Sequence, residues 1–187
     1  MRIIGGQYRS RQIRALPGAD TRPTSDRLRE TLFDVMTAGR PEALEGRVWI
    51  DLFAGTGAVG LEALSRGAST VYFVEASRRA TVMIRQNLQA LGATGGEIIE
   101  RAALPALRLL EAREIVCDLC FLDPPYRAAE AYAQALDYLS VSRLLQPHSI
   151  VVAEHDKHFE PGERFGELAR YRNLRQGDAV LSFYRRS

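Results

Sequence analysis

Long apolar runs are missing from this sequence. No stretch approaches the ~18–20 apolar residues of a membrane span, and the first residues, MRIIGGQYRSRQIRAL, lack the apolar core of about 7–15 residues found in a signal peptide. We therefore expect a soluble, cytoplasmic protein without a membrane partner. Low-complexity runs are absent as well, and 187 residues of 46% hydrophobic composition can bury one sizeable core.

Cysteine and histidine are scarce. Cys117 and Cys120 have the spacing of a redox or zinc motif, but they lie in the apolar run IVCDLCFLD, which indicates a buried strand. Residues three apart in a strand point to opposite faces with Cα atoms ~10 Å apart, too far for a disulfide. His155 and His158 lie in the polar stretch EHDKHFEPGER, which is typical of a loop, with no cysteine nearby. We expect no bound metal.

Lysine is nearly absent, since Lys157 is the single lysine among the 25 basic residues and the others are arginine. Arginine favours bidentate contacts with oxyanions, although a GC-rich genome gives the same excess. The formal net charge is only +2, but the first 29 residues hold seven arginines against Asp20 and Asp26. Such a basic segment usually binds a polyanion; the alternative is an ordinary solvated face.

The body of the chain alternates between strand and helix patterns. An amphipathic helix in RPTSDRLRETLFDVM precedes predicted strands at 47–53, 70–75, 97–101, 115–122 and 149–154, with helices at about 58–66, 78–91, 104–113 and 128–139. This alternation predicts an α/β fold whose parallel sheet carries helices on both faces. The last segment, RYRNLRQGDAVLSFYRR, predicts an antiparallel hairpin. Ligands of such sheets bind beyond the carboxyl ends of the strands, so the motifs there carry the functional argument.

A glycine-rich loop follows the first of these strands, in the run DLFAGTGAVG that begins at Asp51. With Glu75 placed 20 residues after Gly55, it fits a dinucleotide site. Asp51 would, however, repel a pyrophosphate at the N-terminus of the next helix. S-adenosylmethionine has a sulfonium and an ammonium group and no phosphate, and Glu75 can accept both of its ribose hydroxyls. The loop therefore favours S-adenosylmethionine over a dinucleotide, and over a turn that binds nothing.

The tetrapeptide Asp123-Pro124-Pro125-Tyr126 ends the strand CFLD, because neither proline can donate to a strand ladder. An exocyclic amine of a base is a poor nucleophile, since its lone pair is delocalised into the ring. If Asp123 and the Pro124 carbonyl each accept one N–H, the lone pair can turn toward a methyl donor. Tyr126 offers a surface on which a base can stack, worth ~1–3 kcal/mol. A proline-terminated strand with a packed aromatic is the plainer alternative.

Together these motifs resemble the RsmD-type 16S rRNA guanine-N2 methyltransferases. The matching runs are RIIGGQYR, RPTSDRLRETLF, DLFAGTGAVGLEALSRGA, FVE and DPPY. The resemblance implies a Rossmann-like class I methyltransferase fold, with a seven-stranded, mostly parallel sheet, an antiparallel C-terminal hairpin and a small N-terminal hairpin extension. It also implies residues 1–22 as a basic RNA-binding extension and 23–187 as the methyltransferase domain.

The implied target is one guanine, guanine 966 in rRNA numbering, of 16S rRNA in the small ribosomal subunit. The implied donor is S-adenosylmethionine, and we expect a monomer. The catalytic residues would be Asp123, Pro124, Pro125 and Tyr126. The donor-binding residues would be Asp51, Phe53, Ala54, Gly55, Thr56, Gly57, Glu75, Ala76, Ala102, Ala103 and Asp123. The RNA-binding residues would be Arg2, Tyr8, Arg9, Arg11, Arg14, Arg22 and Thr24, the last two closing over the site.

The sequence departs from the family pattern at two places. Ala102 and Ala103 stand where an acidic residue often binds the adenine amine, so that recognition must use backbone groups. Ser10 stands where a glycine is common.

Three other functions compete with this interpretation. A DNA adenine-N6 or cytosine-N4 methyltransferase uses the same chemistry, but usually carries a target-recognition region for which this chain has little room. A non-catalytic rRNA-binding assembly factor would not need Asp123 and the glycine loop. An NAD-dependent oxidoreductase is disfavoured by Asp51, and no acid or base for hydride transfer is evident.

Overall fold

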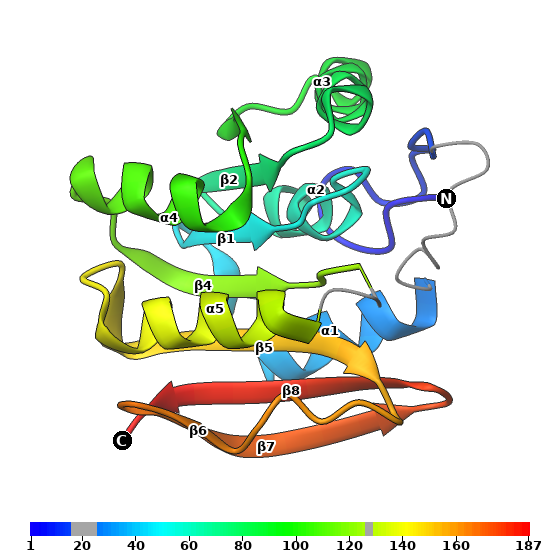
Figure 1. The fold of residues 1–187 in the computed structure, drawn as a ribbon. Helices are drawn as coiled ribbons and strands as arrows, with labels where there is room; N and C mark the ends of the chain where they lie inside the picture. The colour runs from blue at the N-terminus through cyan, green and yellow to red at the C-terminus, as the bar shows by residue number, and fades with distance from the viewer. Residues whose placement is uncertain (16–25, 126–128) are drawn as a thin grey trace.

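The computed structural model describes residues 1–15, 26–125 and 129–187. Its centre is an eight-stranded sheet with the order β3-β2-β1-β4-β5-β8-β7-β6 (Figure 1). The strands are β1 (Val48–Leu52), β2 (Thr70–Glu75), β3 (Gly96–Glu100), β4 (Cys117–Leu122), β5 (Leu145–Asp156), β6 (Arg164–Phe165), β7 (Leu168–Gln176) and β8 (Ala179–Arg186). The first five strands are parallel, and β8, β7 and β6 continue the sheet in antiparallel pairings.

Helices cover both faces of the sheet, as predicted. They are α1 (Asp26–Thr37), α2 (Ala58–Ser65), α3 (Arg78–Leu91), α4 (Ala103–Ala112) and α5 (Ala129–Val141), with a short 3-10 turn, η1 (Pro41–Leu44). The apolar residues of α1, α2 and α3 pack on one face, and those of α4 and α5 on the other. The central strand β1 is buried at nearly every position because both of its faces are covered.

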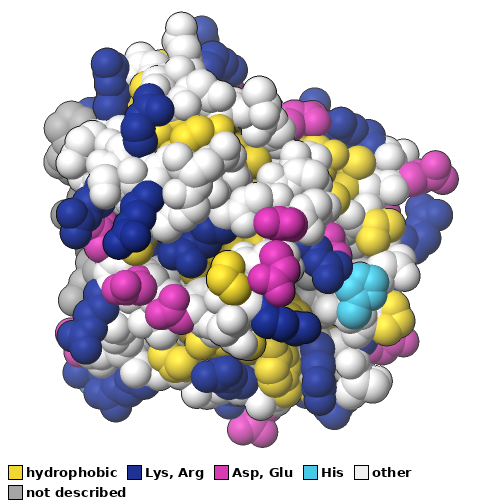
Figure 2. All heavy atoms as spheres, turned by 180° about the vertical axis from the view of Figure 1, so that it is seen from behind, with side chains coloured by type: hydrophobic (Ala, Val, Ile, Leu, Met, Phe, Trp, Pro, Cys, Tyr) yellow, Lys and Arg dark blue, Asp and Glu magenta, His cyan; other side chains and the backbone are white. Residues whose placement is uncertain are grey.

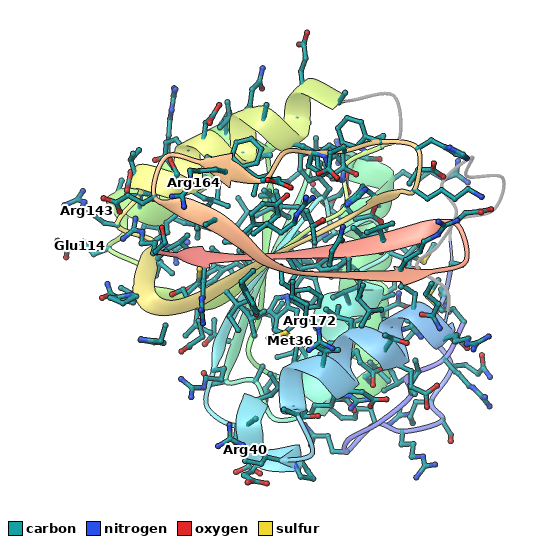
Figure 3. All side chains as sticks on the ribbon, turned by 90° about the horizontal axis from the view of Figure 1, so that it is seen from below. Met36, Arg40, Glu114, Arg143, Arg164 and Arg172 are labelled. Carbon is teal, nitrogen blue, oxygen red and sulfur yellow. The ribbon has the colours of Figure 1, made fainter. Side chains whose placement is uncertain are left out.

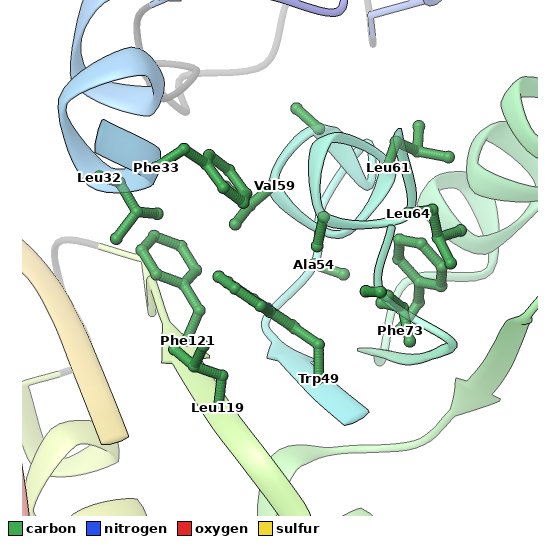
Figure 4. Packing of buried hydrophobic residues seen from close by; sticks show 14 of the residues in the cluster. Leu32, Phe33, Trp49, Ala54, Val59, Leu61, Leu64, Phe73, Leu119 and Phe121 are labelled. Atoms are coloured by element: carbon green, nitrogen blue, oxygen red, sulfur yellow. The ribbon is translucent and has the colours of Figure 1, made fainter. Parts of the chain in front are cut away.

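The core beneath α1 and α2 is aromatic (Figure 4). Phe33 of α1 stacks on Trp49 of β1 with ring centroids 5.4 Å apart, and both side chains are fully buried. Phe121 of β4 belongs to the same cluster. Offset aromatic pairs add about 0.5–1.5 kcal/mol beyond the burial of their area. These contacts fix α1 against the sheet near the start of β1.

The N-terminal extension is a short antiparallel hairpin anchored to the helices. The Ile3 N–H donates to the Arg11 carbonyl (3.0 Å), and Arg2 and Gln12 form an antiparallel bridge. The fully buried carboxylate of Glu62 in α2 accepts the N–H groups of residues 4 and 5 at 2.8 and 2.7 Å. Buried carboxylates are retained only when they are hydrogen-bonded or paired. The hairpin is therefore attached to α2, the helix that follows the glycine loop.

The two glycines of this hairpin lie close to other atoms, which are backbone atoms at Gly6 and the end of a side chain at Gly5. Gly6 has φ of +73°, and a Cβ there would lie 1.8 Å from the Ser65 carbonyl oxygen. A Cβ at Gly5 would meet the guanidinium of Arg66 at 2.7 Å. Ser10, where the family pattern favours glycine, adopts a φ of 67°, a left-handed conformation that an L-residue adopts at some cost.

The C-terminal hairpin continues the sheet and carries arginines on both of its sides. Arg172 of β7 lies over the ring of Phe183 of β8, 5.8 Å from its centroid. Seen from below, Arg172 is on the side of the hairpin toward α1, whereas Arg164 of β6 lies toward α5 (Figure 3). The predicted hairpin is confirmed, and the sheet has eight strands rather than seven because two-residue β6 gives too short a pattern to detect.

The prediction of a loop around His155 was wrong. Strand β5 extends to Asp156, so His155 lies within it, 3% exposed, with Nε2 2.8 Å from the Ser182 hydroxyl of β8. A hydroxyl partner compensates the ring for burial, which makes a polar residue acceptable at this position. His158 lies beyond the strand, and its N–H donates to the Asp156 carboxylate at 2.8 Å.

The two cysteines are free and buried, as predicted, but they do not face opposite sides of the sheet. Both belong to the core cluster beneath α4 and α5. The register of β4 against β5 shifts between Cys117 and Leu119, and this irregularity interrupts the two-residue alternation. Within the described ranges, no helix is long and apolar enough for a bilayer crossing.

Candidate active site

Three predicted motifs meet at the carboxyl ends of β1, β2 and β4. Leu52 of β1 pairs with Leu122 of β4, and Val74 of β2 pairs with Leu52 on the other side. The Asp123 N–H lies 3.4 Å from the Leu52 carbonyl oxygen, so the Asp-Pro-Pro corner begins directly beside the glycine loop. Sheet topology thus places the two motifs next to each other, as expected for an open parallel sheet.

The glycine loop is built from residues with positive φ. Gly55 and Gly57 have φ of 55° and 80°, and Phe53 adopts 68° without the freedom of a glycine. Nothing lies within 4 Å of the point where a Gly55 Cβ would stand, so the backbone there borders open space. At Gly60 a Cβ would lie 2.4 Å from the Phe73 ring, which means that this glycine serves the packing of α2 on β2. The glycines of the loop therefore differ, since a Cβ at Gly55 would face open space and one at Gly60 would clash with packed side chains.

Glu75 holds the loop in place from the end of β2. One carboxylate oxygen accepts the Gly55 N–H at 2.8 Å, and the other accepts the Ser77 N–H at 2.7 Å. Glu75 is half-buried. Because a carboxylate oxygen has two acceptor positions, each oxygen can still accept a hydroxyl. Glu75 can thus hold the loop and a vicinal diol at the same time.

Asp51 is buried at the end of β1, against the start of α2. It is 2% exposed, and its carboxylate accepts the Gly60 N–H of the first turn of α2 at 2.9 Å. Burial raises the pKa of Asp51 to about 7; the Gly60 hydrogen bond acts to lower it and the charge of Glu75 to raise it. The carboxylate predicted at this position therefore lies against the first turn of α2.

Asp123 is accompanied by a second carboxylate that the sequence interpretation did not include. Burial, the charge of Glu154 and the charge of Asp51 together raise the pKa of Asp123 well above its usual range. Glu154 is 3% exposed and follows Ala153, which pairs with Leu122 of β4. Its signal in the sequence was a lone acid after an apolar run, IVVAE, at the end of a predicted strand.

The other predicted donor-binding residues border the same edge. Thr56 is partly exposed in the glycine loop, Ala54 is buried, and Ala76 is exposed after β2. Ala102 is the N-cap of α4 and Ala103 its first residue, and no side-chain cap bonds there. The first N–H groups of α4 thus have no side-chain partner at the cap position. Pro124 is buried and Pro125 exposed.

The predicted RNA-binding residues are placed unevenly. Arg2, Arg9, Arg11 and Arg14 are exposed on the extension. The guanidinium of Arg11 donates to the Ala90 carbonyl of α3, and that of Arg14 to the Gln86 amide oxygen at 3.0 Å. The Tyr8 N–H donates to Ser65 at 2.9 Å. Arg22, Thr24 and the catalytic candidate Tyr126 lie outside the described residues.

A family model described as "Conserved hypothetical protein 95" matches residues 1–185 of this chain. The chain belongs to this family. Its relative YlbH of Bacillus subtilis is 33% identical over 187 residues, covering all of this chain and 99% of that one. The "Ribosomal RNA small subunit methyltransferase D" of Haemophilus influenzae is 34% identical over 161 residues, 84% of this chain and 79% of its own. The predicted relation to the RsmD-type proteins is therefore confirmed.

Solved structures agree with the predicted fold class. The yhhF protein of Escherichia coli, a methyltransferase by its description, superposes with a TM-score of 0.81 at 30% identity, covering 100% of this chain and 98% of its own. A protein of Thermus thermophilus gives 0.83 at 27% identity over 98% of each chain. SMU.776, described as a complex with SAH, shares the fold at a TM-score of 0.64 and 12% identity, over 83% of this chain and 48% of its own. The class I methyltransferase fold is confirmed.

In this member of the family, a buried amide also joins the extension to the glycine loop. Asn87 of α3 is 1% exposed. Its Nδ2 donates to the Thr56 carbonyl at 3.2 Å and to the Arg14 carbonyl at 3.1 Å. A polar residue inside a helix pattern gives no sign in the sequence of a partner 73 positions away, so the sequence interpretation missed it.

Proposed function

We propose that this chain transfers a methyl group from S-adenosylmethionine to the exocyclic N2 of a single guanine in 16S rRNA of the small ribosomal subunit. Membership of a family with relatives named for rRNA methylation supports an rRNA methyltransferase. The observation that supports an exocyclic amine as the methyl acceptor is the position of Asp123 and Pro124 beside the glycine loop, and the family resemblance supplies guanine N2. By the family resemblance, the guanine is number 966 of that rRNA.

The residues at the carboxyl edge fit S-adenosylmethionine. The open space at Gly55 lets a ligand approach the backbone closely, and both oxygens of Glu75 keep an acceptor position for ribose hydroxyls. The uncapped start of α4 at Ala102 and Ala103 offers N–H groups to a ring nitrogen of adenine. Phe53 and Thr56 complete the proposed contacts from the loop. Bound there, the donor supplies an electrophilic methyl carbon on a sulfonium.

Asp123 and Pro124 would prepare the nucleophile. Each accepts one hydrogen of the exocyclic amine, through the carboxylate of Asp123 and the backbone carbonyl of Pro124, which rigid proline geometry holds in place. The amine nitrogen then presents its lone pair instead of delocalising it. Loss of one proton from the methylated amine, to the Asp123 carboxylate or to water, balances the reaction. Tyr126, outside the described residues, is proposed as the stacking surface for the base.

Residues 1–22 are proposed to bind the RNA, and residues 23–187 to carry out the reaction. Basic side chains on the face with α1 and α2 are interspersed with acidic ones (Figure 2). The exposed arginines of the extension are therefore the favoured phosphate contacts, with Arg22 and Thr24 closing over the site. We propose a monomer that works in the cytoplasm on the assembling small subunit.

The product identifies the function. Small subunits from a strain that lacks this enzyme are incubated with labelled donor and the protein, and the rRNA is digested to nucleosides for mass spectrometry. We expect N2-methylguanosine at one site. N6-methyladenosine or N4-methylcytosine would replace the proposal by another amine target, and binding without any methylation would indicate an assembly factor.

The RNA-binding role of the extension has its own test. Reversing the charge of Arg2, Arg9 and Arg14 is expected to weaken subunit binding and to flatten its salt dependence by roughly one unit of slope per lost phosphate contact. Binding is measured between low and moderate salt, with reversal of Arg143 after α5, on the opposite face, as the control. A slope equal to that of the unchanged protein would remove the extension from the binding surface.

A further inference from the structure

Asn87 stands between the two proposed binding sites and contacts both. Its Oδ1 accepts the Arg14 N–H at 2.8 Å, and its Nδ2 donates to the Arg14 carbonyl at 3.1 Å and to the Thr56 carbonyl at 3.2 Å. Both donors of the amide are thus used, one on the extension and one on the glycine loop. With the side chain 1% exposed, water cannot replace a broken bond at low cost.

Next to this amide, the extension is held by hydrogen bonds to α3, the helix that carries Asn87. Arg11 and Arg14 attach it to Ala90 and Gln86, which flank Asn87 on α3. Farther along, Ser65 of α2 accepts the Tyr8 N–H and donates to the Gly5 carbonyl. The extension therefore lies against the two helices whose N-terminal ends flank the proposed donor site.

We propose that Asn87 is a positioning residue that couples RNA binding at the extension to donor binding at the glycine loop. Displacing the backbone of Arg14 either breaks buried hydrogen bonds or moves the amide, and the amide holds the Thr56 carbonyl. A subunit that fixes the extension thereby fixes the loop in the conformation that binds the donor. This inference rests on the proposed function, because it takes the extension as RNA-binding and the loop as donor-binding.

Coupling between two binding sites is reciprocal. If the subunit tightens donor binding by some factor, the donor must tighten subunit binding by the same factor. A residue that only helps the chain to fold would weaken donor binding equally in the presence and absence of the subunit. The ratio of the two dissociation constants therefore separates coupling from folding.

The test measures the dissociation constant of S-adenosylhomocysteine with and without saturating unmethylated small subunits. In the unchanged protein, subunits are expected to tighten binding about fivefold or more. In Asn87→Ala the ratio is expected to fall to about one, and in Asn87→Ser, which keeps one donor, to an intermediate value. Thr81→Val is the matched control, since it removes a buried side-chain donor of the same helix that bonds Glu100 and not the loop.

Two results would overturn the coupling. One is a ratio near one in the unchanged protein, and the other is an unchanged ratio in Asn87→Ala with binding weakened equally in both conditions. Thermal unfolding of each variant establishes that it is folded at the assay temperature. Methyl transfer by the unchanged protein is scored on the same subunits, so failure of the proposed function is seen separately from failure of the coupling.

Discussion

The carboxylates at the carboxyl edge of the sheet, Asp51 and Asp123, differ in their electrostatic surroundings from Glu97, which lies on the flank of the molecule on edge strand β3. At the edge, Asp51 and Asp123 are raised in pKa by burial, and the charges that act on Asp123 among the described residues are those of Glu154 and Asp51, both of its own sign. Away from the carboxyl edge, at the exposed pair of Glu97 on β3 and Arg113 after α4, the hydrogen bond and positive charge of Arg113 lower the pKa of Glu97. The charge of Glu97 is thus balanced by an arginine, whereas the acids at the carboxyl edge repel each other. Such repulsion is typical of a functional site.

The strongest test of this difference is Asp123→Ala. We expect kcat for methyl transfer to fall by about 10²–10⁴-fold, because the amine loses its charged acceptor, while S-adenosylhomocysteine binds within about twofold of the unchanged protein. Asp118→Ala is the control on the same strand, where the carboxylate instead pairs with Arg47 at 2.8 Å. Equal loss of transfer and of binding in Asp123→Ala would make this residue structural.

Asp51→Asn tests how much the buried charge of Asp51 lowers the free energy of unfolding. The pKa of Asp51 lies at about 7 in the folded protein against an ordinary 3.8, so the folded state holds the proton more tightly than the unfolded chain. Its contribution to stability is therefore full at low pH and is lost as the pH rises toward 7. Asparagine keeps an acceptor for the Gly60 N–H and carries no charge. Urea unfolding at pH 8 should show the variant more stable by a few kcal/mol at most, and at pH 4 by little.

Glu154→Gln tests whether the second carboxylate acts on the first. In the proposed reaction, Asp123 must be ionised to accept the amine hydrogen bond and to stabilise the positive charge that forms on the amine. The charges of Glu154 and Asp51 both oppose this ionisation. Without the charge of Glu154, the acid limb of kcat against pH should move to lower pH. Asp51 remains in this variant, so only part of the shift is removed. A limb that does not move would assign Glu154 to packing alone.

The smallest effect is expected on the flank. Glu97 and Arg113 form a bidentate pair, but their side chains are 42% and 39% exposed, so water screens the interaction. A double-mutant cycle of Glu97→Ala and Arg113→Ala should give about 0.2–1 kcal/mol in urea unfolding, and less at high salt. A coupling free energy of several kcal/mol between Glu97 and Arg113 would contradict the weak interaction expected for this exposed pair.

Periodicity was sufficient to predict the sheet, because strands such as β1 and β4 are covered on both faces and appear as continuous apolar runs. It failed at β6, where two residues give no period, and at His155, whose strand continues by pairing with Val180 of β8 while Ser182 bonds the imidazole. It also failed at the cysteines, since an irregular register in β4 cannot be read from the order of residue types.

The residues of the candidate site could be predicted where they directly follow a predicted strand. Gly55, Glu75 and Asp123 stand next to strand ends, so their neighbours follow from topology alone. Glu154 and Asn87 were missed because their partners come from distant segments. Asn87 bonds Arg14, 73 positions earlier in the chain, and only the folded structure places them together.

The single tryptophan, Trp49, lies fully buried on β1 two residues before Asp51, against the ring of Phe33. Its indole emission is therefore that of an apolar environment in the native protein and shifts to longer wavelength when α1 separates from β1. The chain thus contains an intrinsic fluorescence probe, and unfolding of its variants can be followed optically without a label.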